Sequence, residues 1–89
     1  MALFFLEYEL RKPRDYRRFY DEVDRFGAVR VLTCLWCFRN AESDAATLRN
    51  HFAQFMDADD AIVVVEVASW AARGALTHPN KLVLTPRRE

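Results

Sequence analysis

Two carboxylates, Glu7 and Glu9, stand near the end of an apolar run at residues 3–10 and are the side chains best placed to do chemistry. Because side chains alternate along a strand, Phe5, Glu7 and Glu9 are predicted to share one face. Charges on such a strand are solvated, paired with arginines or used to bind a cation. If this face packed on a second copy of the chain, these carboxylates would come close to their symmetry mates, and two carboxylates within about 4–6 Å share a proton or hold a cation. The pattern favours ion pairing with arginines and leaves cation binding open.

A basic run follows Glu9 directly. It holds five basic side chains within the eight positions 11–18, more than a balanced surface carries. They are Arg11, Lys12, Arg14, Arg17 and Arg18. The run either positions phosphate groups of a nucleic acid, or forms a solvated helix face whose arginines meet Asp21, Glu22 and Asp24 at helical spacing. The sequence favours neither of these two interpretations.

The other candidate sites are weaker. Cys34 and Cys37 have the spacing of a redox pair or of half a zinc site. On a strand, residues three apart point to opposite faces, so we expect ordinary buried thiols. His51 and His78 form no ligand motif, and the acidic turn at 57–60 lacks the Gly and distal Glu of a calcium loop. With two glycines, the chain has no glycine-rich phosphate loop, which excludes ATP-driven chemistry.

The composition is that of one folded domain, with 52% hydrophobic side chains among 89 residues. Lys plus Arg and Asp plus Glu both number 13, and the zero net charge counts against strong nucleic-acid binding while allowing a local patch. The first apolar run lacks a basic flank and is interrupted by Glu7, so it predicts neither a signal peptide nor a membrane span. We therefore expect a cytoplasmic protein with reduced cysteines and no membrane partner.

The elements that must position these residues follow a β-α-β-β-α-β order, which predicts an α+β domain of the ferredoxin-like class. The predicted strands are residues 3–10, 29–32, 35–39 and 61–67, and the predicted helices begin at Asp15 and Ser43, the first ending at Gly27. Two helices then cover one face of a four-stranded antiparallel sheet, with the first and last strands side by side at its middle. We assign residues 1–80 to this domain. Residues 81–89 could add a C-terminal edge strand and a basic tail.

The face of the sheet without helices is predicted to be apolar. If the odd-numbered valines of the last strand pack on the helices, its even-numbered residues point outward beside Phe5 and Glu7. A patch of this kind exceeds what a soluble monomer normally exposes, and sheet-to-sheet homodimerisation is the simplest way to cover it. The predicted interface consists of Phe5, Glu7, Ile62, Val64 and Glu66.

Several short stretches, in order along most of the chain, carry a family resemblance. They are Tyr8-Glu9-Leu10-Arg11-Lys12-Pro13, Asp15-Tyr16, Tyr20, Gly27-Ala28 and residues 33–36, 59–64 and 69–74. In these stretches the chain resembles small proteins related to the CRISPR spacer-integration subunit, and most of all the stand-alone homologues sometimes labelled SinR-like. The virulence-associated protein D toxins, which cut RNA, share the architecture that this resemblance implies. That architecture is a ferredoxin-like homodimer, often with a C-terminal strand laid on the partner's sheet.

The resemblance also implies a site. Active members are metal-dependent nucleases in which an aspartate ending the first strand, one per subunit, holds a divalent ion between protomers. Glu9 stands at that position, which makes it the candidate catalytic residue and the candidate ligand of Mg²⁺ or Mn²⁺. Its extra methylene moves the carboxylate by more than a site with bonds of about 2 Å tolerates without rearrangement.

Two functions therefore remain open, and with them the question whether the protein is an enzyme. The first is a structural or regulatory homodimer that is non-catalytic or weakly active, with nucleic-acid binding left open. The second is a metal-dependent nuclease, cutting RNA or DNA, in which Glu9 holds the metal and the basic run holds phosphates. The balanced charge and the glutamate in place of aspartate favour the first. The sequence indicates no small-molecule substrate and no cofactor beyond the Mg²⁺ or Mn²⁺ of the second function.

Overall fold

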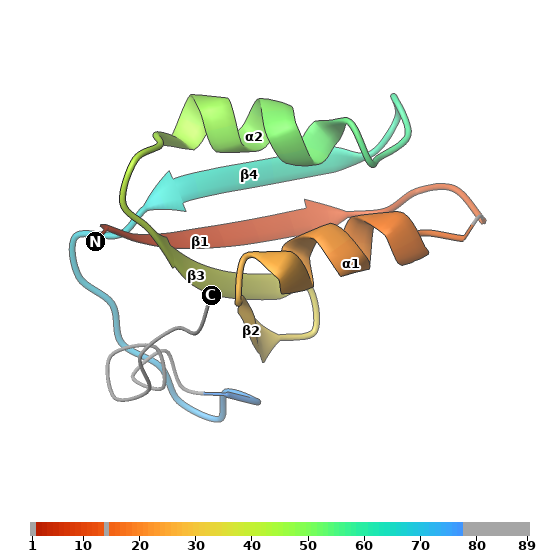
Figure 1. The fold of residues 1–89 in the computed structure, drawn as a ribbon. Helices are drawn as coiled ribbons and strands as arrows, with labels where there is room; N and C mark the ends of the chain where they lie inside the picture. Colours follow the sequence, from red (N-terminus) through yellow and green to blue (C-terminus); the bar gives the residue numbers. More distant parts are fainter. Residues whose placement is uncertain (1, 14, 78–89) are drawn as a thin grey trace.

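The computed structural model describes residues 2–13 and 15–77, which form an α+β domain with one four-stranded sheet and two helices (Figure 1). The elements are β1 (Ala2–Glu9), α1 (Arg17–Arg25), β2 (Val29–Leu32), β3 (Leu35–Asn40), α2 (Ala45–Ala53) and β4 (Ala61–Glu66). This order is the predicted one. Arg14, His78 and the edge strand expected within residues 81–89 lie outside the described residues.

The sheet has the strand order β2-β3-β1-β4, and every neighbouring pair is antiparallel. β1 pairs with β4, as predicted, but the expectation that both lie at the middle of the sheet is wrong. The interior strands are β1 and β3, because β1 is hydrogen-bonded to β3 on one side and to β4 on the other. β4 is therefore an edge strand of the described sheet. The arrangement is consistent with a ferredoxin-like fold.

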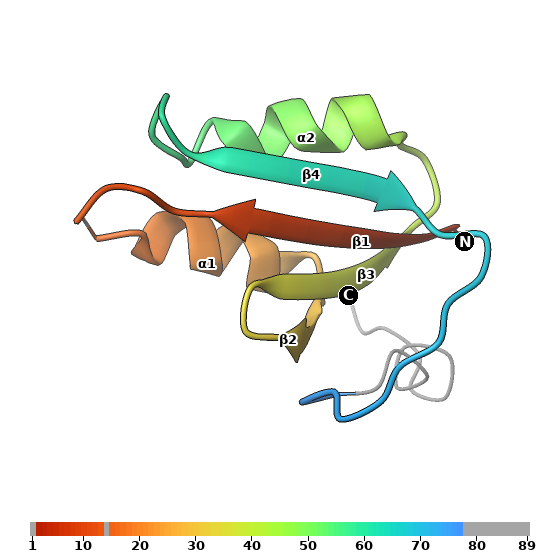
Figure 2. The ribbon, with the colours of Figure 1, turned by 180° about the vertical axis from the view of Figure 1, so that it is seen from behind.

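The two helices lie together on one face of the sheet, and Figure 2 shows the opposite face, which neither α1 nor α2 covers. A two-residue turn, Thr33-Cys34, joins β2 to β3 at the predicted place. The pairing of these strands shifts between Arg30 and Leu32, which indicates a bulge at Val31. The chain after β4 returns to this outer strand, where the Leu76 N–H donates to the Val31 carbonyl at 2.7 Å.

The helix boundaries differ by one residue from those predicted. The N-cap of α1 is Tyr16, and the Asp15 carboxylate instead accepts the Arg17 N–H at 2.8 Å. Gly27 ends the helix as predicted, with φ of 71°, a conformation that favours glycine.

In α2 the cap is Asp44, not Ser43. Asp44 has an extended backbone, and its Oδ1 accepts the Thr47 N–H at 2.8 Å, which satisfies a donor of the first turn. This hydrogen bond lowers the pKa of Asp44. No helix among the described residues is long and apolar enough to cross a membrane.

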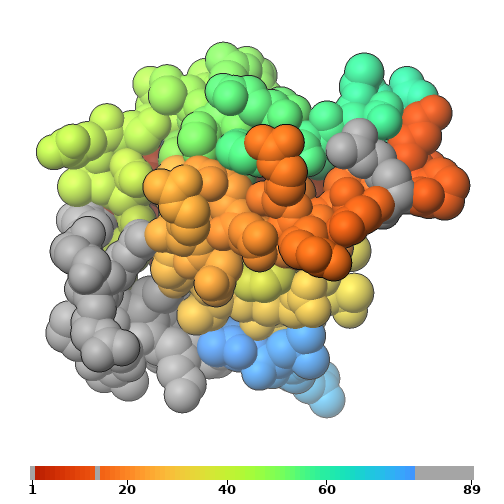
Figure 3. All heavy atoms as spheres, turned by 45° about the vertical axis from the view of Figure 1, so that its right-hand side comes forward, coloured from red at the N-terminus to blue at the C-terminus, as the bar shows by residue number. Residues whose placement is uncertain are grey.

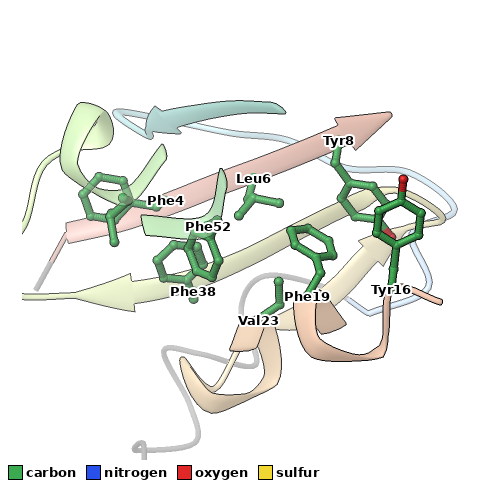
Figure 4. Close-up of a cluster of buried hydrophobic side chains, with 9 residues drawn as sticks. Phe4, Leu6, Tyr8, Tyr16, Phe19, Val23, Phe38 and Phe52 are labelled. Atoms are coloured by element: carbon green, nitrogen blue, oxygen red, sulfur yellow. The ribbon is translucent and has the colours of Figure 1, made fainter. Parts of the chain in front are cut away.

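The core lies between the helices and the sheet and is largely aromatic (Figure 4). Its buried members are Phe4, Leu6, Tyr8, Tyr16, Phe19, Val23, Phe38, Leu48 and Phe52. The even-numbered side chains of β1 face this core, as the alternation predicted. Each fully buried side chain of this size contributes about 1.5–3 kcal/mol relative to an exposed one. The packing therefore fixes which face of β1 carries the acidic residues.

The prediction of which β4 side chains point away from the helices is wrong. Ile62 and Val64 pack against the core, because they lie opposite the buried Tyr8 and Leu6 in the register. Glu66 lies opposite Phe4, again on the helix side. The outward valines are Val63 and Val65, which are 60% and 44% exposed. The run of valines carries no alternation, so the sequence fits either register equally well.

Candidate functional site

Glu9 is the last residue of β1 and is paired with an arginine. Its side chain is 68% exposed, and its Oε1 accepts hydrogen bonds from Arg11 Nη2 at 2.6 Å and Arg11 Nε at 3.1 Å. The hydrogen bond with Glu9 raises the pKa of Arg11 above its ordinary value. The sequence left solvation, pairing with arginine and cation binding open for this carboxylate. The structure shows pairing with Arg11.

A network of polar contacts joins the loop after β1 to the turn before β4, which lie against each other in Figure 3. The Arg11 N–H donates to Asp60 Oδ1 at 2.7 Å, and Arg11 Nη1 donates to the Asp59 carbonyl at 3.0 Å. Lys12 Nζ pairs with Asp59 Oδ2 at 2.8 Å. We call Glu9, Arg11, Lys12, Asp59 and Asp60 the loop cluster. The acidic turn at 57–60 is thus a partner of the basic run.

The basic run does not form one uncompensated patch. Arg11 and Lys12 belong to the loop cluster, and Arg17 lies 3.7 Å from the Asp15 carboxylate. The Arg18 guanidinium lies 5.7 Å from the centre of the Phe55 ring, on the helix side. Partners therefore engage each of these four basic side chains, which weakens the phosphate-binding interpretation of the run as a whole.

The residues around Glu9 do not fit a divalent ion. Among the described residues, no group of three or more His, Cys, Asp and Glu side chains lies close enough to hold a metal. A cation bound to Glu9 Oε1 would have to displace the Arg11 guanidinium. Glu7 lies two residues earlier on the same face, exposed, and pairs across the sheet with Val63 and Leu35.

The two cysteines are free thiols on different faces of the sheet, as predicted. Cys34 is half-buried and packs against the core, whereas Cys37 lies opposite Phe5 and Val29 on the other face. Burial raises the pKa of the Cys37 thiol to about 11, so it stays protonated and unreactive at neutral pH.

The sequence missed a second polar cluster, which we call the helix cluster. The Glu22 side chain of α1 is only 7% exposed. Its Oε2 lies 2.5 Å from Nε2 of His51 in α2, and its Oε1 accepts a hydrogen bond from Arg25 Nη1 at 2.9 Å. Burial opposes ionisation of Glu22, but the His51 hydrogen bond and the Arg25 charge outweigh it and lower the pKa. The signal was present in the sequence, since Glu22 stands three residues after Phe19, on the apolar stripe of α1.

The face of the sheet that α1 and α2 leave uncovered, which we call the open face, holds the remaining candidate surface. It is exposed along β4, whereas Cys37 on the same face is fully buried. Phe5 is half-buried there, and Val63 and Val65 are exposed beside it, with Glu7 and Glu9 at one end. Comparison with models of known protein families finds no match, and comparison with solved structures finds none. The function must therefore be inferred from the chain's own residues.

Proposed function

We propose that the protein is a ferredoxin-like homodimer, formed through the open face of its sheet, that does not cut nucleic acid. The observation that carries this proposal is the exposure of Val63 and Val65 beside Phe5 on a face that no helix covers. Apolar side chains gathered in this way mark an interaction surface. This revises the predicted interface: Phe5 and Glu7 remain, whereas Ile62 and Val64 are used in the core.

The pairing of Glu9 with Arg11 supports the proposal that the protein does not cut nucleic acid. A metal-dependent nuclease needs a carboxylate free to hold its ion, and Arg11 occupies one of the two Glu9 oxygens, Oε1. Nucleic-acid binding stays part of the proposal in a weak, salt-dependent form, since Arg17 and Arg18 are exposed at the start of α1.

Sedimentation of three proteins tests the dimer. We expect the native chain to be a dimer at micromolar concentration and Val63→Lys to be a monomer, because a lysine in this interface leaves a buried charge. Ala53→Lys, on an exposed position of α2, is the matched control and should remain dimeric. A monomeric native chain, or a dimeric Val63→Lys, would contradict the proposal.

Labelled RNA and duplex DNA, incubated with and without Mg²⁺ or Mn²⁺, test the absence of cleavage. We expect the labelled RNA and DNA to remain uncut under every condition. Metal-dependent cleavage that is lost in Glu9→Ala but kept in Glu42→Ala, an exposed glutamate in another loop, would overturn the proposal in favour of the nuclease. Binding that weakens as salt rises, without cleavage, supports the nucleic-acid part.

A further inference from the structure

Arg30 of β2 is held over an aromatic ring. Its guanidinium carbon lies 4.7 Å from the centre of the Trp36 ring and 6.0 Å from that of Tyr20. Trp36 is also its partner in the β2–β3 ladder, so both side chains lie on the helix side of the sheet. A guanidinium stacked on an aromatic face keeps its hydrogen-bonding edge in a fixed direction. Arg30 is therefore oriented before any ligand arrives.

This charge has no acidic partner in the part of the chain that the structure describes. Arg30 makes no ion pair or hydrogen bond there, and its Nε is buried without an acceptor. Partly buried charges are normally paired, because desolvation without a partner costs free energy. Nη1 and Nη2 are not among the buried unpartnered atoms, so they are the atoms that a ligand can reach.

The neighbouring polar groups carry no charge. Trp36 Nε1 donates to the Tyr8 hydroxyl over 3.4 Å, and that hydroxyl lies 3.4 Å from the Tyr20 hydroxyl and 3.5 Å from the Thr33 carbonyl. These distances are long for hydrogen bonds, so the groups are weakly satisfied. Burial, the largest cause, raises the pKa of Tyr20 to about 12, so its hydroxyl remains a donor at neutral pH. These neighbours of Arg30 therefore include no anion, although the hydroxyls and the Thr33 carbonyl can accept hydrogen bonds.

We propose that Arg30, together with the Tyr20 hydroxyl, binds a phosphate group. A phosphate presents acceptor oxygens in several directions, which suits a flat guanidinium edge on β2 and a hydroxyl donor on α1. The phosphate comes either from a free nucleotide or from single-stranded RNA. Arg30 lies on the helix side of the sheet, so this site does not depend on the proposed dimer interface.

Titration followed by nitrogen–proton NMR tests this site. Inorganic phosphate, uridine monophosphate and a short oligouridylate are added separately at constant ionic strength. We expect saturable shifts of the Arg30 Nε–H and Trp36 Nε1–H signals. Tighter binding of the mononucleotide assigns the site to free nucleotides, and tighter binding of the oligonucleotide assigns it to RNA. An absence of saturable shifts with all three would overturn the proposal.

Arginine variants distinguish specific phosphate binding at Arg30 from nonspecific attraction of phosphate to positive charge. Arg30→Lys keeps the charge but loses the flat edge, and should bind phosphate about tenfold more weakly. Arg30→Met should not bind. Arg49→Met, which removes an exposed arginine of α2 whose side chain bonds its neighbour Asn50, should bind like the native chain. If Arg30→Met does not fold, Arg30→Lys decides. Unchanged affinity in Arg30→Lys, or saturation by acetate as strong as by phosphate, would overturn the proposal.

Discussion

The loop cluster and the helix cluster contain the same chemistry in two different surroundings. In the first, Glu9 is paired with Arg11 and its side chain is 68% exposed; in the second, Glu22 is paired with His51 and Arg25 and is 7% exposed. An exposed ion pair gains little, because water and salt screen it. A buried carboxylate that loses its partners keeps its desolvation cost. The carboxylate that matters most to stability is thus Glu22, which the sequence placed on a solvated helix face in one of its two interpretations of the basic run.

The largest expected effect is that of Glu22→Ala. Removing this carboxylate leaves His51 without its partner and opens space between α1 and α2. We expect the free energy of unfolding to fall by about 2–3 kcal/mol, measured by urea denaturation. Glu22→Gln, which keeps an acceptor in the same place, should lose less. An unchanged urea midpoint for Glu22→Ala would remove the distinction between the two clusters.

Acid should erase the contribution of Glu22. Its pKa is lowered in the folded protein, so the folded state binds its proton less readily than the unfolded chain does. The stabilisation is fully present above the ordinary value of 4.5 and is lost as the pH falls through the lower, folded pKa. The difference in stability between the native chain and Glu22→Gln should shrink over that acidic window. A difference that grows as the pH falls would contradict this assignment.

Asp60→Ala should have an intermediate effect. Asp60 accepts the Arg11 N–H through Oδ1 and the Asp57 N–H through Oδ2, and so holds the two loops together. Losing it should lower the free energy of unfolding by about 1 kcal/mol, measured by urea denaturation. Asp60→Asn keeps one acceptor and serves as the control. A larger effect than that of Glu22→Ala would show that the loops, not the helix pair, hold the domain.

The smallest effect is expected for Glu9→Gln. Both Glu9 and its partner are in water, so the variant should unfold at the same urea concentration as the native chain. Glu42→Gln is a matched exposed control. A measurable loss confined to Glu9→Gln would show that the loop cluster behaves as a buried site.

Local pattern determined the order of elements, the β2–β3 turn and the buried face of β1. The order of elements and the buried face of β1 depend on alternation, on helical periodicity and on single residues such as Gly27, and those signals act over a few positions. The β2–β3 turn was predicted because residues 28–38 are too long a β-rich run for one strand. The helix caps were predicted to within one residue. In α2 the neighbour of Ser43, Asp44, makes the capping hydrogen bond to the Thr47 N–H. In α1 Tyr16 takes the cap position without a side-chain hydrogen bond, and the Asp15 carboxylate accepts the Arg17 N–H from one residue earlier.

Tertiary structure alone decided the face of β4, the partners of Glu9 and the burial of Glu22. The valines of β4 are equally apolar on both faces, so its pairing with β1 selects which of them enter the core. Arg11 meets Asp59 and Asp60 across 48 and 49 residues of chain. Glu22 meets His51 only because α1 and α2 pack side by side. The sequence states which charges exist, and the packing of distant segments decides which are paired, exposed or buried.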